Sequence, residues 1–303
     1  MSDAKPDELV KQLKETLARR RFRPMPIVLG VLALSVVILA GLAYFLHTGP
    51  RQAPLQVLAF DAVVVEEEAP VARVQIYSVE PESPITSLRR KTVVVQEPRR
   101  VNQIDEKPRM VTLKSDDSGQ VSIEWPIGKH PIGEFLASYI DVEKQHASVN
   151  DRGMIFVWPK DAPIMIVVDE TLIGEALDAD AGATLTKAAA EGWRIVYVCF
   201  DQIGPAGFAL NRQWLRRQPK LPRGPVLTPR KLLESPASAD SRREVFAELH
   251  QRFTGPKLAI VKTASNARIT QDVGLPTAII GQADNVAGIL NVASWADVPV
   301  KLK

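Results

Sequence analysis

The chain has 303 residues, of which 46% are hydrophobic and 24% are charged, so it holds enough apolar material for about two globular domains. Its net charge is only +3, and its basic residues are not interleaved with aromatic ones, which argues against a nucleic-acid-binding protein. The single cysteine, Cys199, excludes an internal disulfide bond. The four histidines lie far apart without a carboxylate or thiol at ligand spacing, so we expect no zinc site.

The N-terminal part contains a long uncharged run. Residues 1–24 place apolar side chains at helical spacing between charges, which predicts a weakly amphipathic cytoplasmic segment. The run from Pro26 to Leu46 has the length of about 20 residues that a membrane-spanning helix needs, so we assign residues 25–47 to a transmembrane helix. Four arginines precede it within Ala18–Arg23 and only Arg51 follows closely, which predicts a cytoplasmic N-terminus. The C-terminal domains are then expected in the periplasm or outside the cell, on an uncleaved anchor whose partner is membrane lipid.

Residues 55–160 consist of short β-branched or aromatic segments separated by turn signals, a pattern that predicts an antiparallel β-sandwich. Alternation over residues 120–125 supports this prediction. The strand that follows the turn at residues 116–119 and the segment at residues 133–141 resemble immunoglobulin-like domains of bacterial surface proteins. The resemblance implies a spacer module without catalytic residues. The adjacent glutamates Glu66–Glu68 point in different directions, so we interpret them as a solvated loop rather than a calcium site.

From residue 161 to residue 303, strand patterns alternate with helix patterns. The predicted strands are Ile164–Val168, Trp193–Phe200, Lys257–Val261 and Pro276–Gly281. The predicted helices are Asp180–Gly192, Ala206–Gln218, Ser241–Phe253, Ala267–Gly274 and Ala283–Asn291. Continuous apolar strands joined by helices predict a parallel sheet in a three-layer α/β domain. Ligand sites in such sheets lie at the carboxyl ends of the strands, so the residues just after Val168, Val198 and Val261 are the candidates.

The stretch from Trp193 to Pro229 contains a strand, a polar tip, a helix with the segment Arg-x-Trp-Leu, and the segment Leu-Pro-x-Gly-Pro-Val-Leu. This stretch resembles the haloacid dehalogenase-like (HAD-like) superfamily, and within it the lipin-like C-terminal subgroup. The likeness covers Ala162–Trp295 and implies a Rossmann-like sheet. It also implies an aspartate nucleophile that ends the first strand and a second aspartate two residues later. A hydroxyl group, a lysine and acidic magnesium ligands complete the site that the resemblance implies.

The chain departs from this pattern. If Thr171 and Leu172 match the Thr-Leu of the first motif, Asp169 falls on the second aspartate and Val167 on the nucleophile, and valine cannot attack phosphorus. The other positions are occupied by Cys199 for the hydroxyl group, Arg242 or Arg243 for the lysine, and Lys262 and Asn266 for the magnesium ligands. Because an ammonium group repels a metal cation, the resemblance implies a degenerate site that holds no metal.

Two alternatives remain open at Asp169 and Cys199. A competing register makes Asp169 the nucleophile and Thr171 the residue two positions later, with Mg²⁺ as cofactor, which predicts a phosphohydrolase. Cys199 ends a strand, but no histidine is near it in the sequence, so we interpret it as a buried, inert thiol. No P-loop, nucleophile elbow or dinucleotide fingerprint is present in the sequence.

The sequence therefore predicts a membrane-anchored, extracytoplasmic, non-catalytic HAD-like protein without a cofactor. It is expected to bind a phosphate-bearing or anionic lipid ligand, or a protein partner in the cell envelope, because strand tips, helix N-termini and positive charge remain at the site. Non-catalytic members of the lipin-like subgroup bind phosphatidic acid, which agrees with this expectation. The predicted ligand-binding residues are Asp169, Cys199, Arg243, Lys262 and Asn266. The alternatives are a Mg²⁺-dependent phosphohydrolase that uses Asp169 and a pure scaffold protein of the envelope.

Overall fold

The computed structural model describes residues 8, 10–15, 34–39, 55–78, 88–97, 109–125, 132–141, 146–173, 177–200, 204–230, 238–281 and 286–301. The chain divides into two compact units, Met1–Gln52 and Ala53–Lys303, and each is described by itself. The second unit contains both stretches for which the sequence predicts a globular domain, residues 55–160 and residues 161–303. We call the parts of this unit the β module and the α/β module.

The first unit contains the residues to which the sequence assigns a transmembrane helix. Among the residues that the structure describes, no helix has both the length and the apolar character that a membrane crossing requires. Of residues 25–47 the structure describes 34–39, and the rest of the predicted helix lies outside the described residues. The finding corrects the predicted transmembrane helix and the single-pass localisation, whereas the membrane-lipid partner stays a prediction.

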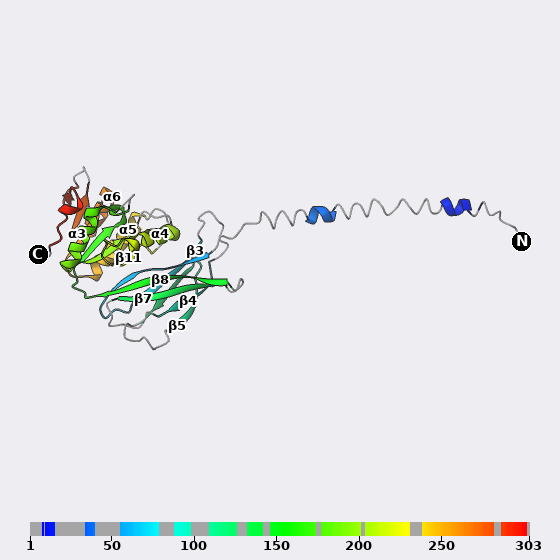
Figure 1. Ribbon diagram of the computed structural model, residues 1–303, viewed down its shortest axis with the longest axis horizontal. Coiled ribbons are helices and arrows are strands. Elements are labelled where there is room, and N and C mark those ends of the chain that lie inside the picture. Colours follow the sequence, from blue (N-terminus) through cyan, green and yellow to red (C-terminus); the bar gives the residue numbers. More distant parts are fainter. Residues whose placement is uncertain are drawn as a thin grey trace. The chain divides into compact units, whose positions relative to one another are not determined.

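The β module consists of two sheets (Figure 1). The first has the strand order β1-β3-β6 and is antiparallel; its strands are β1 (Leu55–Ala59), β3 (Val71–Ser78) and β6 (Gln120–Glu124). The second has the order β2-β8-β7-β4-β5; its strands are β2 (Ala62–Val65), β8 (His146–Trp158), β7 (Ile132–Asp141), β4 (Thr92–Gln96) and β5 (Met110–Lys114). Because β2 runs parallel to β8, this sheet is mixed, and the prediction of an antiparallel sandwich is wrong.

Within residues 55–65, β1 and β2 belong to different sheets. The buried side chain of Asp61, which lies between the two strands, explains this arrangement. The chain leaves the first sheet after Ala59, and the carboxylate of Asp61 accepts hydrogen bonds from the backbone amides of Met154 in β8 and Val226 in the α/β module. These bonds hold the start of β2 against β8 in a parallel direction. Alternation of residue types carries no information about strand direction, so the sequence pattern could not indicate this pairing.

The α/β module is built on a six-stranded sheet in the order β11-β10-β9-β12-β13-β14, in which each pair is parallel. The strands are β9 (Ile164–Val168), β10 (Arg194–Val198), β11 (Val226–Leu227), β12 (Lys257–Val261), β13 (Thr277–Ile280) and β14 (Leu290–Val292). All five residues of β9 are buried, because β10 and β12 flank the strand and other side chains cover both faces of the sheet. A continuous apolar run without alternation suits such a central strand.

Four helices of this module are described: α3 (Ala179–Ala190), α4 (Gly204–Arg217), α5 (Ala239–Arg252) and α6 (Ala264–Asp272). Asp178, Ser238 and Thr263 cap the N-termini of α3, α5 and α6 with their side-chain oxygens. The helix predicted over residues 283–291 is wrong in its described part. Residues 286–289 are a turn with Gly288 at a φ of 80°, and Leu290 begins β14, which adds to the sheet beside β13.

The two modules share hydrophobic cores. Phe60 of the β module stacks on Phe208 of α4 with ring centroids 5.9 Å apart. On the other face of the parallel sheet, Trp158 at the end of β8 contacts Phe253 at a centroid distance of 6.0 Å. Aromatic pairs of this kind add to stability beyond the effect of the apolar area that they bury. The two modules therefore form a single folded unit rather than two independent domains joined by a linker.

Candidate functional site

The carboxyl edge of the parallel sheet has a topological switch point at β9. From β9 the chain moves outward through β10 and β11 and then returns to the other side of β9 with β12, β13 and β14. In open α/β sheets, ligands bind in the crevice at such a point. The residues that follow β9 and β12, beginning with Asp169 and Lys262, therefore determine whether this edge of the sheet can bind a ligand or catalyse a reaction.

Asp169 stands at this point, but its carboxylate is enclosed. Only 2% of the residue is exposed. Its Oδ1 accepts hydrogen bonds from the backbone amides of Glu170 at 3.1 Å and Phe200 at 3.3 Å, and its Oδ2 accepts one from the Asn211 side chain at 3.4 Å. A carboxylate that binds protein donors on both oxygens has little freedom to attack a phosphorus atom in line.

Val167 lies inside β9 rather than at its tip. The residue is fully buried in the same core cluster as Phe208 of α4 and Leu185 of α3. Position 167 is therefore a packing position in this chain, and the first side chain beyond the end of the strand is that of Asp169.

The crevice between β9 and β12 is closed by a carboxylate of the chain itself. Glu170 Oε1 accepts hydrogen bonds from the backbone amides of Lys262 at 2.7 Å and Thr263 at 3.0 Å. These amides precede the first turn of α6, where the helix dipole and unpaired N–H groups favour an anion. Glu170 thus occupies the position at which an external phosphate would bind the helix terminus.

Arg242 and Asn266 meet beside this crevice. Arg242 Nη1 donates to Asn266 Oδ1 at 3.0 Å, and the Arg242 guanidinium lies 5.6 Å from the ring centre of Phe200. Two buried polar atoms nearby have no hydrogen-bond partner: Asn266 Nδ2 and Glu170 Oε2. Sequence reasoning weighed Arg242 and Arg243 for this position, and the structure places Arg242 there.

The other predicted site residues are not gathered at the crevice. Arg243 forms ion pairs on the surface with Asp240 at 2.8 Å and Asp272 at 3.4 Å. Cys199 is fully buried in a core cluster. Thr171 donates its hydroxyl group to the carbonyl oxygen of Val168 at 2.6 Å.

Lys262 is exposed, and its backbone amide rather than its ammonium group makes the contact with Glu170. Of the predicted residues, the structure therefore brings Asp169 and Asn266 to the edge of the sheet as side chains. The residue that closes the edge, Glu170, was missed. Its position directly after Asp169 was the available signal, but nothing in the sequence shows which amides it reaches.

The donors at this edge do not fit a magnesium ion. Mg²⁺ needs oxygen ligands in octahedral geometry. Within the described ranges, no group of three or more His, Cys, Asp or Glu side chains is placed to hold a metal ion. Asp169 and Glu170 direct their oxygens at N–H donors, and Lys262 follows β12. We derive no catalytic step through a metal.

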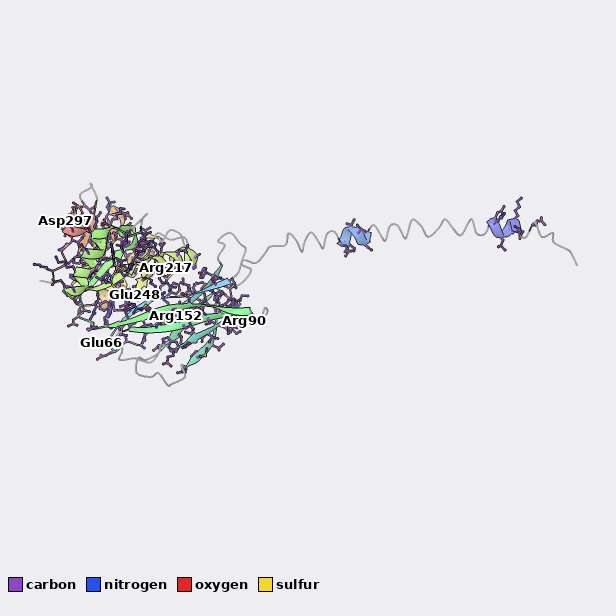
Figure 2. All side chains as sticks on the ribbon, in the orientation of Figure 1. Glu66, Arg90, Arg152, Arg217, Glu248 and Asp297 are labelled. Atoms are coloured by element: carbon purple, nitrogen blue, oxygen red, sulfur yellow. The ribbon has the colours of Figure 1, made fainter. Side chains whose placement is uncertain are left out.

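Two hollows lie where the β module meets the α/β module, and arginines line both. The first, which we call the α4 groove, has a volume of about 660 Å³ and is lined by four arginines together with Tyr77, Asn150 and Gln213. The four are Arg152, Arg212, Arg216 and Arg217. Figure 2 labels Arg152 and Arg217, which come from β8 and α4.

Two arginines of the α4 groove hold the modules together. Arg212, which is 4% exposed, forms hydrogen bonds with the carbonyl oxygen of Ala59 and with Asp151 in the β module. Arg216 binds the fully buried carboxylate of Asp61 at 2.5 Å. Burial raises the pKa of Asp61, and the Arg216 and Arg212 guanidinium groups oppose that rise. Arg212 and Arg216 are therefore engaged in structure.

The second hollow, which we call the α5 cavity, has a volume of about 310 Å³. It lies between β3 and β6 of the β module and α5 of the α/β module. Its charged side chains are three arginines, Arg73, Arg230 and Arg252, and four acids, Asp61, Glu68, Glu244 and Glu248. The sequence pattern indicated neither hollow, because residues as far apart as Asp61 and Arg252 line the α5 cavity and no local pattern connects such residues.

A scan against families of known proteins and a search of curated proteins both find no match. Solved structures give weak matches. A trypsin-activated α2-macroglobulin from Escherichia coli is 14% identical, with 37% of this chain covering 9% of that chain and a TM-score of 0.27. A cycloisomaltooligosaccharide glucanotransferase from Paenibacillus sp. is 14% identical, with coverages of 69% and 27% and a TM-score of 0.28.

The CARDB domain of the PF1109 protein from Pyrococcus furiosus is 13% identical, with coverages of 35% and 91% and a TM-score of 0.21. The chain thus spans about a tenth to a quarter of the first two proteins. Such scores show no common overall fold. Nothing in these matches supports the likeness to the HAD-like superfamily or its lipin-like subgroup, and that resemblance stays a prediction.

Proposed function

We propose that this chain is a non-catalytic binding protein for ligands that carry an oxyanion group, a phosphate or a carboxylate, and that the ligand lies between the two modules. The observation that carries the proposal is the presence of arginines at both hollows. Four lie with one acid, Asp151, at the α4 groove, and three lie with four acids at the α5 cavity, where Arg73 forms no ion pair with a described residue. A guanidinium group offers five N–H donors in a planar fork and keeps its charge when it is partly buried, which suits bidentate binding of an oxyanion.

The closed edge of the parallel sheet supports binding rather than turnover. Asp169 is 2% exposed and accepts hydrogen bonds on both oxygens. Glu170 occupies the amides at the start of α6. A phosphoryl group that approached this edge would have to displace protein contacts at two places before it met a nucleophile.

The proposal is tested by linkage between ligand binding and stability. A ligand that binds the folded chain at about ten times its Kd adds about 1.4 kcal/mol to the free energy of unfolding. We expect sodium phosphate or sodium acetate to raise the melting temperature of the full chain above that in sodium chloride at equal ionic strength. Equal melting temperatures in all three salts, over the full range of concentration, would show that the chain has no oxyanion site.

The rival function is a phosphohydrolase that uses Asp169, and the position of this residue at the switch point favours it. Its test is the hydrolysis of a generic phosphate monoester by the full chain with Mg²⁺, compared with the variant Asp169→Asn. We expect the same background rate in both proteins. A rate in the wild type that falls at least about a hundredfold in the variant would establish the rival.

A further inference from the structure

Arg73 differs from the other arginines at the boundary between the modules. It lies on β3, where the neighbouring residues Ala72 and Val74 are buried in the core of the β module, so its side chain points to the opposite face and into the α5 cavity. The half-buried guanidinium group lies 5.2 Å from the ring centre of Phe60. The Arg73 side chain forms no hydrogen bond and no ion pair with any residue that the structure describes.

Two of the carboxylates that line the cavity are engaged with other arginines. Glu248 Oε1 accepts from Arg252 at 2.9 Å, and Glu248 Oε2 accepts from Arg230 at 3.4 Å. Glu68 lies 3.7 Å from the Arg252 Nε atom. Glu248 attracts Arg73 electrostatically, but neither glutamate forms an ion pair with it.

Burial lowers the pKa of Arg73, the positive charge of Arg230 adds to this effect, and the negative charge of Glu248 opposes it. A charge that is withdrawn from water and only partly compensated destabilises the empty protein. An anion that entered the cavity would remove this cost, because it would accept hydrogen bonds from Arg73 and reduce the repulsion between the two guanidinium groups. Glu244 also lines the cavity, but it lies on the exposed surface of α5 and is not an electrostatic neighbour of Arg73.

We infer that the α5 cavity is the oxyanion site of this protein, with Arg73 and Arg230 as the ligand-binding residues and a phosphate or carboxylate group as the ligand. This inference rests on the proposed function and assigns its binding site to the α5 cavity. Ser122, which pairs with Arg73 across β3 and β6, adds a hydroxyl group to the same wall of the cavity. The volume of about 310 Å³ accommodates an oxyanion with a small organic group attached to it.

The test is isothermal titration calorimetry on the full chain with sodium phosphate in one arm and sodium acetate in the other, at constant ionic strength. The variant Arg73→Met keeps the apolar stem and removes the charge. We expect it to weaken binding about tenfold or more. The matched control is Arg194→Met, which removes an exposed arginine that lines neither hollow and is expected to change affinity by less than about twofold. Arg217→Met is the corresponding change in the α4 groove. The stronger arm identifies the ligand as a phosphate or a carboxylate.

A second measurement separates this role from a structural one. Without ligand, Arg73→Met is expected to melt at the same temperature as the wild type or above it, because the variant lacks a partly buried charge that forms no ion pair. If Arg73→Met does not fold, the affinity of Arg230→Met is measured in its place. The Arg230 side chain is 70% exposed, so its loss leaves the core intact.

The outcomes distinguish this inference from the proposed function. Unchanged affinity in Arg73→Met, or in Arg230→Met where that variant decides, would overturn the location in the α5 cavity. Loss of binding in Arg217→Met with full binding in Arg73→Met would place the site in the α4 groove and leave the proposed function in force. If the wild type bound neither phosphate nor acetate, the proposed function would be wrong as well.

Discussion

The carboxylate of Asp61 joins three segments of the chain, and its replacement by asparagine tests how the modules are held together. Asp61 is 2% exposed. Its Oδ1 accepts from the Met154 amide at 2.9 Å and from Arg216 Nη2 at 2.5 Å, and its Oδ2 accepts from the Val226 amide at 3.0 Å. Because all of these partners are N–H donors, a proton on Asp61 would have no acceptor, so the site fits the ionised carboxylate.

Asparagine has nearly the same shape but places an NH₂ group on one side. Whichever way the amide is turned, this group faces a backbone N–H, from Met154 or from Val226. The variant also leaves Arg216 without its carboxylate. Removing one partner of a buried ion pair costs about 3–5 kcal/mol, so we expect the free energy of unfolding to fall by about 3 kcal/mol or more in Asp61→Asn.

The assay is urea unfolding of the full chain at neutral pH. The matched control is Arg152→Gln, which breaks the ion pair with Glu134 at 3.3 Å, where both side chains are more than half exposed. That change is expected to cost less than about 1 kcal/mol. In the double variant Asp61→Asn and Arg216→Met, the loss is expected to be smaller than the sum of the single losses by about 1 kcal/mol or more.

A loss below about 1 kcal/mol in Asp61→Asn would refute the reasoning, because it would mean that water or a shift of the backbone satisfies these donors at no cost. Additive losses in the double variant would show that Asp61 and Arg216 act independently. The ion pair would then contribute nothing to stability beyond the separate contributions of its two side chains.

Two further predictions concern Tyr197 and Glu170. Tyr197 is buried and donates to the carbonyl oxygen of Pro222 at 2.8 Å, so Tyr197→Phe is expected to cost about 0.5–1.5 kcal/mol at neutral pH. Burial raises the pKa of Tyr197 above its value in the unfolded chain. The extra stability that tyrosine gives over phenylalanine is therefore complete below about pH 10, the pKa in the unfolded chain, and decreases as the pH rises above that value. Urea unfolding midpoints of both proteins at about pH 8 and about pH 11 measure this decrease. Glu170→Ala removes the acceptor for two amides at the start of α6 and is expected to cost about 1–2 kcal/mol in the same assay, whereas Glu170→Gln retains an acceptor and is expected to lose less than half as much.

Each of these predictions has an outcome that would contradict it. An advantage of tyrosine that stays constant or grows between about pH 8 and about pH 11 would mean that ionisation of Tyr197 is not linked to unfolding. Equal stability of Glu170→Ala and the wild type would show that the amides of Lys262 and Thr263 find water without loss, and that Glu170 does not close the crevice.

The local patterns located several elements of the α/β module. The run Ile164–Val168 is the central strand β9, and the helix pattern over Ser241–Phe253 corresponds to α5. The turn at Gly288 and the short strand β14 were missed, because three residues beside a turn carry too little periodicity to compete with a helix pattern. The uncharged run at Pro26–Leu46 was taken as a membrane span on length and hydropathy alone, and the structure corrected that interpretation.

At the candidate site, the sequence indicated the edge of the sheet but not the state of its side chains. Asp169 was placed at a strand tip because an acidic residue directly follows an apolar run. Its burial could not be predicted, since Phe200 and Asn211 reach it from segments 31 and 42 residues away. The choice between Arg242 and Arg243 also depended on the rotation of α5, which directs Arg242 to Asn266 and Arg243 to the surface.

The sequence by itself determined which segments are strands at the centre of the α/β module, approximately where α3, α4, α5 and α6 lie, and which residue first leaves β9, because apolar runs and helical periodicity are local properties of the chain. Tertiary structure alone decided that β2 runs parallel to β8, that Glu170 fills the terminus of α6, and that Arg73 lines the α5 cavity without an ion pair to a described residue. These features depend on which groups, distant in the sequence, come within hydrogen-bond or ion-pair distance. The same type of side chain therefore differs in accessibility and in the charges around it from one site to another.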